Sequence, residues 1–119
     1  MSEFDELKEK IRKFAADRDW NQYHTPKNLS MALIAECGEL VEHFQWLTDA
    51  ESSNIPPEGL EEISHEIADV FVYLLRLSDK LGIDMVKAVN CKMLLNEAKY
   101  PADEVRGSAK KYTEYKRRR

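Results

Sequence analysis

Apolar residues recur every three or four positions along most of the chain, which is the spacing of one face of an α-helix. No stretch alternates apolar and polar residues as a half-buried strand does. The pattern predicts four helices, over about residues 3–17, 28–47, 59–81 and 84–99. Ser2, Asn28 and Asp84 are placed to cap three of them, and Gly82 to end the third in a left-handed conformation. We therefore predict an all-α fold of the four-helix-bundle type.

Two segments interrupt the helical pattern. Residues 20–27 are expected to form an aromatic-rich loop, and residues 48–58, with Pro56 and Pro57, a surface loop. A chain of 119 residues suits one domain, 1–119, with a helical core over about 3–100 and a basic arm or tail over about 101–119.

The net charge of −4 is unevenly distributed. The last ten residues hold six basic side chains and one acidic one, so the rest of the chain carries the acidic excess. Stable binding to nucleic acid is therefore not expected. The sequence has no apolar run of about 18 residues and no pattern of a secretion signal, and its two cysteines lack metal-ligand spacing. We expect a cytoplasmic protein that does not enter a membrane.

Two acidic pairs occupy equivalent positions on the second and third predicted helices. Glu36 and Glu39 lie beside one apolar stripe, and Glu66 and Asp69 lie beside the next, thirty residues later. If the helices pack antiparallel on these stripes, the four carboxylates face one space. Such a set of oxygen ligands suits Mg²⁺, with Mn²⁺ as a substitute. The alternative is solvated surface charge, which is common in acidic chains.

The third predicted helix is apolar on most of its faces. Its stripe towards the second helix is expected to consist of Ile63, Ile67, Val70, Leu74 and Leu77. The matching stripe of the second helix is expected to consist of Leu33, Cys37, Leu40, Phe44 and Leu47. Phe71, Val72 and Leu75 extend the apolar surface of the third helix to other sides. Because such a helix is usually buried from several directions, we expect a second copy of the chain to cover part of it.

The order Glu36-x-x-Glu39 followed by Glu66-x-x-Asp69 resembles the signature of the MazG-like all-α nucleoside triphosphate pyrophosphohydrolases. The likeness runs from about residue 12 to 115 and is greatest to the dCTP pyrophosphatase branch. It rests on Asp19–Trp20, His24 with Pro26, Asn28–Leu29, residues 36–40, Phe44–Gln45–Trp46, Lys92–Met93, Asn96, Tyr100–Pro101 and residues 111–114.

This resemblance implies Mg²⁺-dependent hydrolysis of a deoxynucleoside triphosphate to its monophosphate and pyrophosphate, for sanitation or balance of the nucleotide pool, with dCTP or a modified dCTP favoured. It implies that the four acids are the catalytic metal ligands. It also implies a homotetramer built as a dimer of dimers. The side chains that it places against the nucleotide are Trp20, His24, Trp46, Tyr73, Lys92, Asn96 and Lys99.

Two departures from the pattern bear on nucleotide selectivity. Ile11 stands where the animal dCTP enzymes align a substrate-contacting His, and residues 97–99 are less basic than theirs. Two other classes stay open from the residues alone. One is a noncatalytic helical oligomerisation or regulatory module, and the other is a di-iron carboxylate bundle, for which only Glu62 and His65 have Glu-x-x-His spacing.

Overall fold

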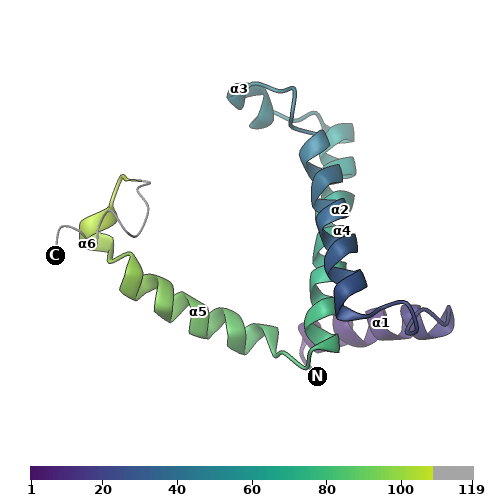
Figure 1. Ribbon diagram of the computed structural model, residues 1–119. Coiled ribbons are helices and arrows are strands. Elements are labelled where there is room, and N and C mark those ends of the chain that lie inside the picture. The colour runs from purple at the N-terminus through teal and green to yellow at the C-terminus, as the bar shows by residue number, and fades with distance from the viewer. Residues whose placement is uncertain (109–119) are drawn as a thin grey trace. The chain divides into compact units, whose positions relative to one another are not determined.

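The computed structural model describes residues 1–108, and every regular element in this range is a helix (Figure 1). The elements are α1 (Glu3–Asp17), α2 (Pro26–Glu42), α3 (Asp49–Ser52), α4 (Pro57–Lys80), α5 (Met85–Lys99) and α6 (Ala102–Val105). The all-α prediction is confirmed over these residues. The basic tail expected at the C-terminus lies largely outside them.

The chain divides into two compact units, Met1–Ile83 and a second unit that begins at Asp84. The first unit contains α1 to α4, and the second contains α5 and α6. A single domain over 1–119 and a four-helix-bundle arrangement therefore stay predictions. Over the described part of the chain, no helix has the length and apolar character needed to cross a membrane.

The helix boundaries follow local capping. The Oγ of Ser2 accepts a hydrogen bond from the Asp5 amide at 3.1 Å, and the Oδ1 of Asp84 accepts one from the Lys87 amide at 3.1 Å. Gly82 has a φ of 68° after the end of α4. These three predictions are confirmed, because each residue supplies the group or the conformation that a helix end requires.

The start of α2 corrects the sequence prediction. The cap is Thr25, whose Oγ1 accepts from the Asn28 amide at 3.2 Å, and the helix begins with Pro26 in its first turn. Asn28 instead donates its side-chain amide to the Tyr23 carbonyl at 3.0 Å. Proline needs no amide partner in the first helical turn, so the helix begins two residues earlier than the expected cap.

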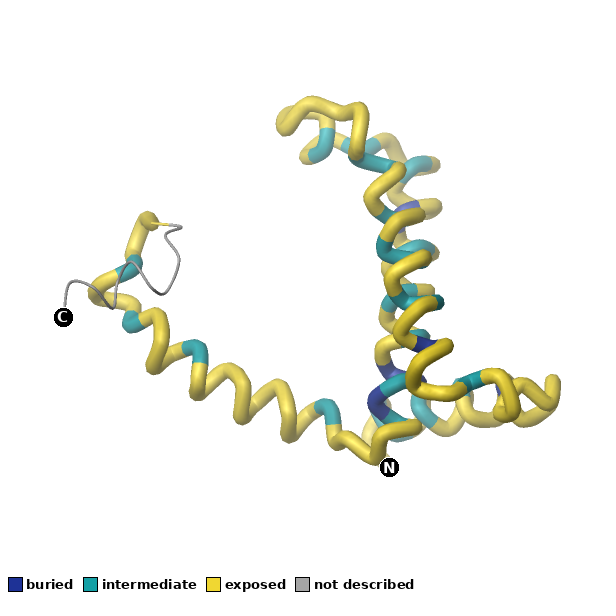
Figure 2. The backbone as a smooth tube through the Cα atoms, viewed as in Figure 1, coloured by how far each residue is buried: buried dark blue, intermediate teal, exposed yellow. Residues whose placement is uncertain are grey.

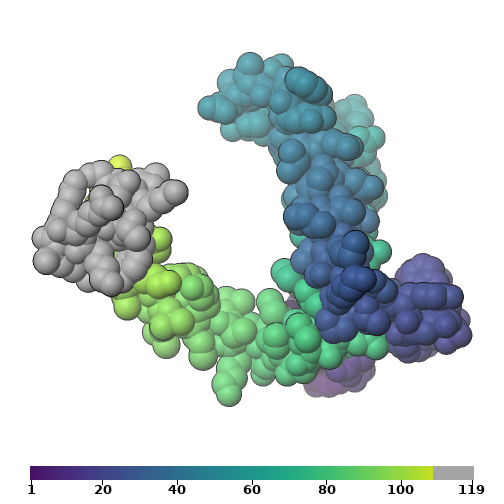
Figure 3. Space-filling view, in the orientation of Figure 1, coloured from purple at the N-terminus to yellow at the C-terminus, as the bar shows by residue number. Residues whose placement is uncertain are grey.

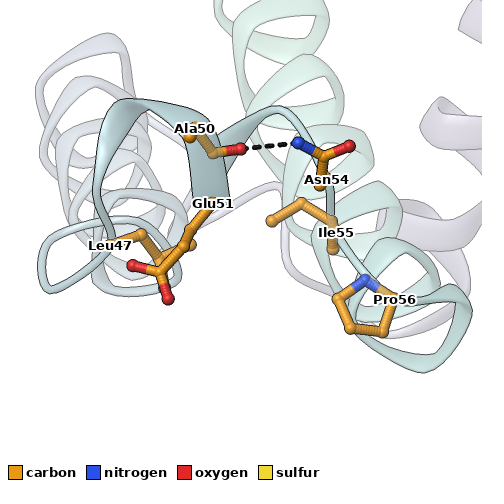
Figure 4. Close-up of a pocket in the computed structure, with 6 residues that line it drawn as sticks. All are labelled: Leu47, Ala50, Glu51, Asn54, Ile55 and Pro56. Atoms are coloured by element: carbon orange, nitrogen blue, oxygen red, sulfur yellow. Dashed lines mark hydrogen bonds between the residues drawn. The ribbon is translucent and has the colours of Figure 1, made fainter.

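The connection from α2 to α4 also differs from the predicted loop. Helix α2 ends at Glu42, and the short helix α3 follows, closed by a capping box between Thr48 and Glu51. Asn54 Nδ2 donates to the Ala50 carbonyl at 2.8 Å (Figure 4). This segment borders a cavity of about 490 Å³ lined by Leu47, Ala50, Glu51, Asn54, Ile55 and Pro56.

Helices α2 and α4 run antiparallel and pack along their length, and α1 also packs against α4 (Figures 1 and 3). Buried and half-buried positions follow this contact (Figure 2). Among these positions on α4, one set has alternating steps of three and four, at Ile63, Glu66, Val70, Tyr73 and Leu77. On α2 a set with the same spacing is formed by Leu29, Leu33, Glu36 and Leu40, and His43 directly after the helix continues it. This is the seam of a helix pair.

The seam corrects the predicted stripe of α4. Ile67 is 53% exposed and Leu74 is 38% exposed in this chain, whereas Glu66 and Tyr73 are half-buried. A repeat of 3.5 residues selects Glu66 and Tyr73 together with Ile63, and it leaves Ile67 and Leu74 about one residue out of register. The acidic residues of the seam are thus part of the helix contact.

Candidate metal and nucleotide site

Three of the four predicted carboxylates meet between α2 and α4. Glu36, Glu39 and Glu66 each offer an oxygen, and these oxygens all lie within 4.8 Å of one another. Glu36 and Glu66 are half-buried, whereas Glu39 is exposed at the rim. The antiparallel pairing places the middle of α2 opposite the middle of α4, so two glutamates of the seam face each other.

The buried oxygens of this group lack partners. Among the described residues, Oε2 of Glu36 and Oε2 of Glu66 are buried without a hydrogen-bond donor. Buried polar atoms in folded proteins are nearly always paired, so two orphaned carboxylate oxygens at one place indicate a missing ligand. Oxygen-only donors of this charge fit a hard divalent cation such as Mg²⁺ or Mn²⁺.

The electrostatics agree with that fit. Burial, together with the hydrogen bond and charge of Glu39 and smaller contributions from Asp69 and Glu66, raises the pKa of Glu36 to about 7. His43 Nε2 lies 3.8 Å from Glu66 Oε1 at the other side of the group. The sequence predictions did not include His43 in the site, although its seam position next to Glu39 was a usable signal.

Asp69 lies outside the three-carboxylate group but borders a neighbouring cavity. This cavity of about 430 Å³ lies between α1, the loop after it and α4. Its lining consists of Lys10, Ile11, Phe14, Trp20, Asp69, Val72 and Tyr73. The volume falls in the range of small-molecule sites. Two predicted nucleotide contacts, Trp20 and Tyr73, and the selectivity position Ile11 therefore share one cavity with a predicted metal ligand.

The loop between α1 and α2 holds Trp20 and His24 in defined positions. Asp19 ends α1 with a φ of 54°, and the Trp20 amide donates to the Ala15 carbonyl at 2.9 Å. The Trp20 ring packs edge-on against Phe14 with centroids 5.6 Å apart, and its centroid lies 6.0 Å from that of His24. The aromatic loop expected from the sequence is thus ordered at the edge of the cavity.

Arg76 anchors this loop, and the sequence predictions missed it. Its side chain is only 5% exposed. Its Nε donates to His24 Nδ1 at 3.3 Å, and its NH2 group donates to Asn21 Oδ1. An arginine within the apolar run Leu74–Leu77 was the signal, because buried arginines are almost always paired.

The remaining predicted contacts stay predictions. Trp46 lies in the turn after α2, is 86% exposed and is absent from the lining just described. Lys92, Asn96 and Lys99 lie on α5 in the second unit. Their contact with a nucleotide stays a prediction. Glu62 and His65 are both exposed and outside the three-carboxylate group, which does not favour a di-iron centre over the described residues.

The fold and the site together define an all-α protein whose antiparallel helices place carboxylates beside an aromatic-lined cavity. A family model described as the MazG-like family matches residues 32–115, so the chain belongs to the MazG-like family.

Relatives and a solved structure extend this match. The chain is 45% identical over 103 residues to dCTP pyrophosphatase 1 of Homo sapiens, covering 85% of this chain and 61% of that protein. It is 44% identical over 106 residues to dCTP pyrophosphatase 1 of Mus musculus, covering 87% and 62%. The chain thus spans less than two thirds of the length of these relatives. A crystal structure of a pyrophosphatase from Archaeoglobus fulgidus is similar, with a TM-score of 0.76, 42% identity, and coverage of 85% of this chain and 94% of that one.

Proposed function

We propose that this protein is a magnesium-dependent nucleotide pyrophosphohydrolase that cleaves a deoxynucleoside triphosphate between its α and β phosphates. The products are the monophosphate and pyrophosphate, and dCTP or a 5-substituted dCTP is the favoured substrate. The observation that carries the proposal is the cluster of Glu36, Glu39 and Glu66, in which two buried oxygens have no donor among residues 1–108, together with the cavity lined by Trp20, Asp69 and Tyr73. The similarity to dCTP pyrophosphatase 1 of two mammals and to an archaeal pyrophosphatase supports the same reaction class.

The four acids would hold the metal. Glu36 and Glu66 would supply oxygens from within the helix seam, and Glu39 would supply one from the rim. Asp69 lines the cavity, and its charge contributes to the raised pKa of Glu36. When bound, Mg²⁺ supplies neutralisation of the polyphosphate charge and acidifies water for attack on phosphorus. The acidic residues also keep a nucleotide from binding without its cation, because like charges repel.

The cavity would hold the nucleoside. Trp20 and Tyr73 offer aromatic faces for a base, and Ile11 and Phe14 offer apolar contact. His24 lies next to Trp20 and would donate a hydrogen bond. Asp69 on the cavity wall would orient the nucleotide, with its phosphates towards the carboxylates and their cation and its base towards the aromatic residues. The resemblance adds Lys92, Asn96 and Lys99 as phosphate contacts.

A second copy of the chain would complete the site. Large apolar side chains of α4 are exposed at heptad-like spacing in the single chain, and these are Leu60, Ile67, Phe71 and Leu74, followed by Leu81 directly after the helix. Exposed apolar stripes of this length are typical of helix–helix interfaces. Association on this stripe would build the homotetramer, a dimer of dimers. It would also bring the exposed Trp46 to a nucleotide bound by another subunit. A cytoplasmic role in nucleotide-pool sanitation follows from such an activity.

The test is a panel of canonical and 5-substituted deoxynucleoside triphosphates with Mg²⁺, in which pyrophosphate and orthophosphate are resolved. We expect monophosphate plus pyrophosphate, with a cytosine nucleotide turned over fastest and no reaction in excess chelator. Release of orthophosphate alone would place the cleavage at another bond. Lack of hydrolysis across the panel, together with lack of metal binding, would favour the noncatalytic module instead.

A further inference from the structure

The three nitrogens of the Arg76 guanidinium point to three different residues. The Nε donates to His24 Nδ1 at 3.3 Å, the NH2 group donates to Asn21 Oδ1, and the NH1 group lies 3.7 Å from Asp79 Oδ2. Asp79 also receives two hydrogen bonds from Arg12 of α1, at 2.6 and 2.5 Å. The buried Arg76 of α4 thus contacts Asn21 and His24 of the Trp20–His24 loop, and Asp79 connects it to Arg12 of α1.

The bond to His24 determines where the imidazole carries its proton. Arginine has only donors, so Nδ1 of His24 must accept. In a neutral imidazole one ring nitrogen accepts and the other carries hydrogen, so Nε2 is the donor. A protonated imidazole would have a hydrogen on Nδ1 as well, which would oppose the Arg76 N–H. The hydrogen bond is compatible with one form of His24, the neutral Nε2–H tautomer.

The surroundings favour that neutral form. Burial lowers the pKa of His24, and the charges of Arg76 and Lys80 lower it further. Arg12, Asn21, Arg76, Asp79 and Lys80 also line a cavity of about 400 Å³. Asp79 is the carboxylate of this lining, and it is already bonded to Arg12. Its charge is therefore shared between two guanidinium groups and does little to stabilise an imidazolium.

We infer that Arg76 is a positioning residue of the nucleotide site, which fixes the Trp20–His24 loop and holds His24 as a neutral Nε2–H donor. The kinetic part of this inference rests on the proposed function, in which His24 contacts the nucleotide. The structural part does not. Lysine cannot replace Arg76, because a single ammonium lacks the planar fork that reaches His24 and Asn21 together.

The direct test is ¹⁵N NMR of the imidazole rings in the full-length protein at pH 7.5. The chain has three histidines, so His24→Gln assigns the His24 signals by their loss. We expect the wild-type ring as the Nε2–H tautomer, and in Arg76→Lys a mixture of both tautomers. Arg12→Lys is the matched control, since it changes the other arginine of the network without touching His24, and it should keep the wild-type pattern.

The kinetic test uses a double-mutant cycle. Arg76→Lys is expected to raise KM for the preferred nucleotide about 10-fold, the loss typical of a charged hydrogen bond, with kcat within about two-fold. If Arg76 acts through His24, the double variant Arg76→Lys, His24→Gln should have the KM of His24→Gln alone. A merely structural role would instead add the two effects.

The outcomes separate this inference from the proposed function. A wild-type His24 seen as the Nδ1–H tautomer or as imidazolium would overturn it, as would an unchanged tautomer in Arg76→Lys or additive KM effects. The wild-type spectrum decides even if Arg76→Lys does not fold. A protein that hydrolyses no nucleotide but shows the Nε2–H ring would refute the proposed function and leave the structural assignment standing.

Discussion

Helix α4 carries two groups of partly buried charge that differ in how they are neutralised. Around Glu66, three carboxylates approach within 4.8 Å, and two of their buried oxygens have no donor among the described residues. Around Arg76, ten residues later, each guanidinium nitrogen has a polar neighbour, and Asp79 is bonded by Arg12. The two groups share one helix but have opposite hydrogen-bond status.

Two buried oxygens of the carboxylate group need a partner from outside the described residues, whereas the Arg76 group has its partners within them. Removing two charges from water is costly unless hydrogen bonds compensate, and the Arg76 group has those bonds. In the Glu66 group two buried oxygens have no donor among the described residues and the carboxylates repel one another, so a cation is the compensation that fits this geometry. The first group is therefore expected to respond to metal, and the second to respond only to changes in its own partners.

The largest effect is expected for Glu36→Gln in the carboxylate group. The change keeps the shape of the side chain but removes a charged metal ligand, and a catalytic cation contributes several kcal/mol to stabilising charge in the transition state. We expect pyrophosphate release to fall about 1000-fold and the midpoint for Mg²⁺ to rise. Without metal, the variant should unfold at higher urea than the wild type, because one of three repelling charges is gone.

Glu42→Gln is the matched control for this prediction. Glu42 is the last residue of the same helix and is exposed. It should keep wild-type turnover, metal response and stability within about 0.5 kcal/mol. If Glu36→Gln lowers the stability of the metal-free protein, the carboxylates do not repel one another, and the contrast between the carboxylate group and the Arg76 group is wrong.

The next largest effect is expected for Asp79→Asn in the Arg76 group. Asp79 is 12% exposed and serves two guanidinium groups, so its loss leaves the buried Arg76 without a counter-charge. Breaking a buried pair on one side costs about 3 kcal/mol, and we expect that loss in the free energy of unfolding measured by urea. The response to Mg²⁺ should not change.

Asp17→Asn removes a carboxylate from an exposed pair with Lys13, with an N–O distance of 2.6 Å. Exposed pairs of this kind contribute less than about 1 kcal/mol, so this variant should be nearly as stable as the wild type. Equal losses in the two variants would mean that burial does not strengthen the Asp79 contacts.

Much of the fold could be predicted from the sequence because it depends on local rules. Ser2, Asp84 and Gly82 act at helix ends as their chemistry requires. The errors came from competing local signals: Pro26 in the first turn of α2 moved the cap from Asn28 to Thr25. The capping box of α3 was also readable, as Thr48 followed by Glu51.

The site was predictable in part, for a physical reason. The helical wheel placed the glutamates beside the helix contact and not within it. A wheel assumes 3.6 residues per turn, whereas a seam between two packed helices repeats every 3.5 residues, so the two select different neighbouring residues. For this reason Glu66 is half-buried where the wheel selected Ile67. Arg76 was missed because its partners, His24 and Asn21, lie more than fifty residues earlier. Contacts of that range are absent from local patterns.

The third effect is the dependence of stability on pH, which has opposite sign at the carboxylate group and at the Arg76 group. The pKa of Glu36 is raised from its usual 4.5 to about 7, so the folded state binds the extra proton and stability falls as pH rises through this window. The hydrogen bond from Arg12 lowers the pKa of Asp79 below its usual 3.8, so that contribution is present above pH 3.8 and is lost as pH falls further.

The free energy of unfolding of the metal-free protein, measured in urea between pH 3 and 8, should therefore pass through a maximum. Its fall on the acid side and its fall on the alkaline side should have separate causes. Glu36→Gln should flatten the fall above about pH 5, and Asp79→Asn should flatten the fall at the acid side. Because a cation competes with protons for carboxylates, Mg²⁺ should restore stability at pH 8 and have little effect at pH 4. A Mg²⁺ effect of equal size at both pH values would mean that the cation binds elsewhere than at Glu36.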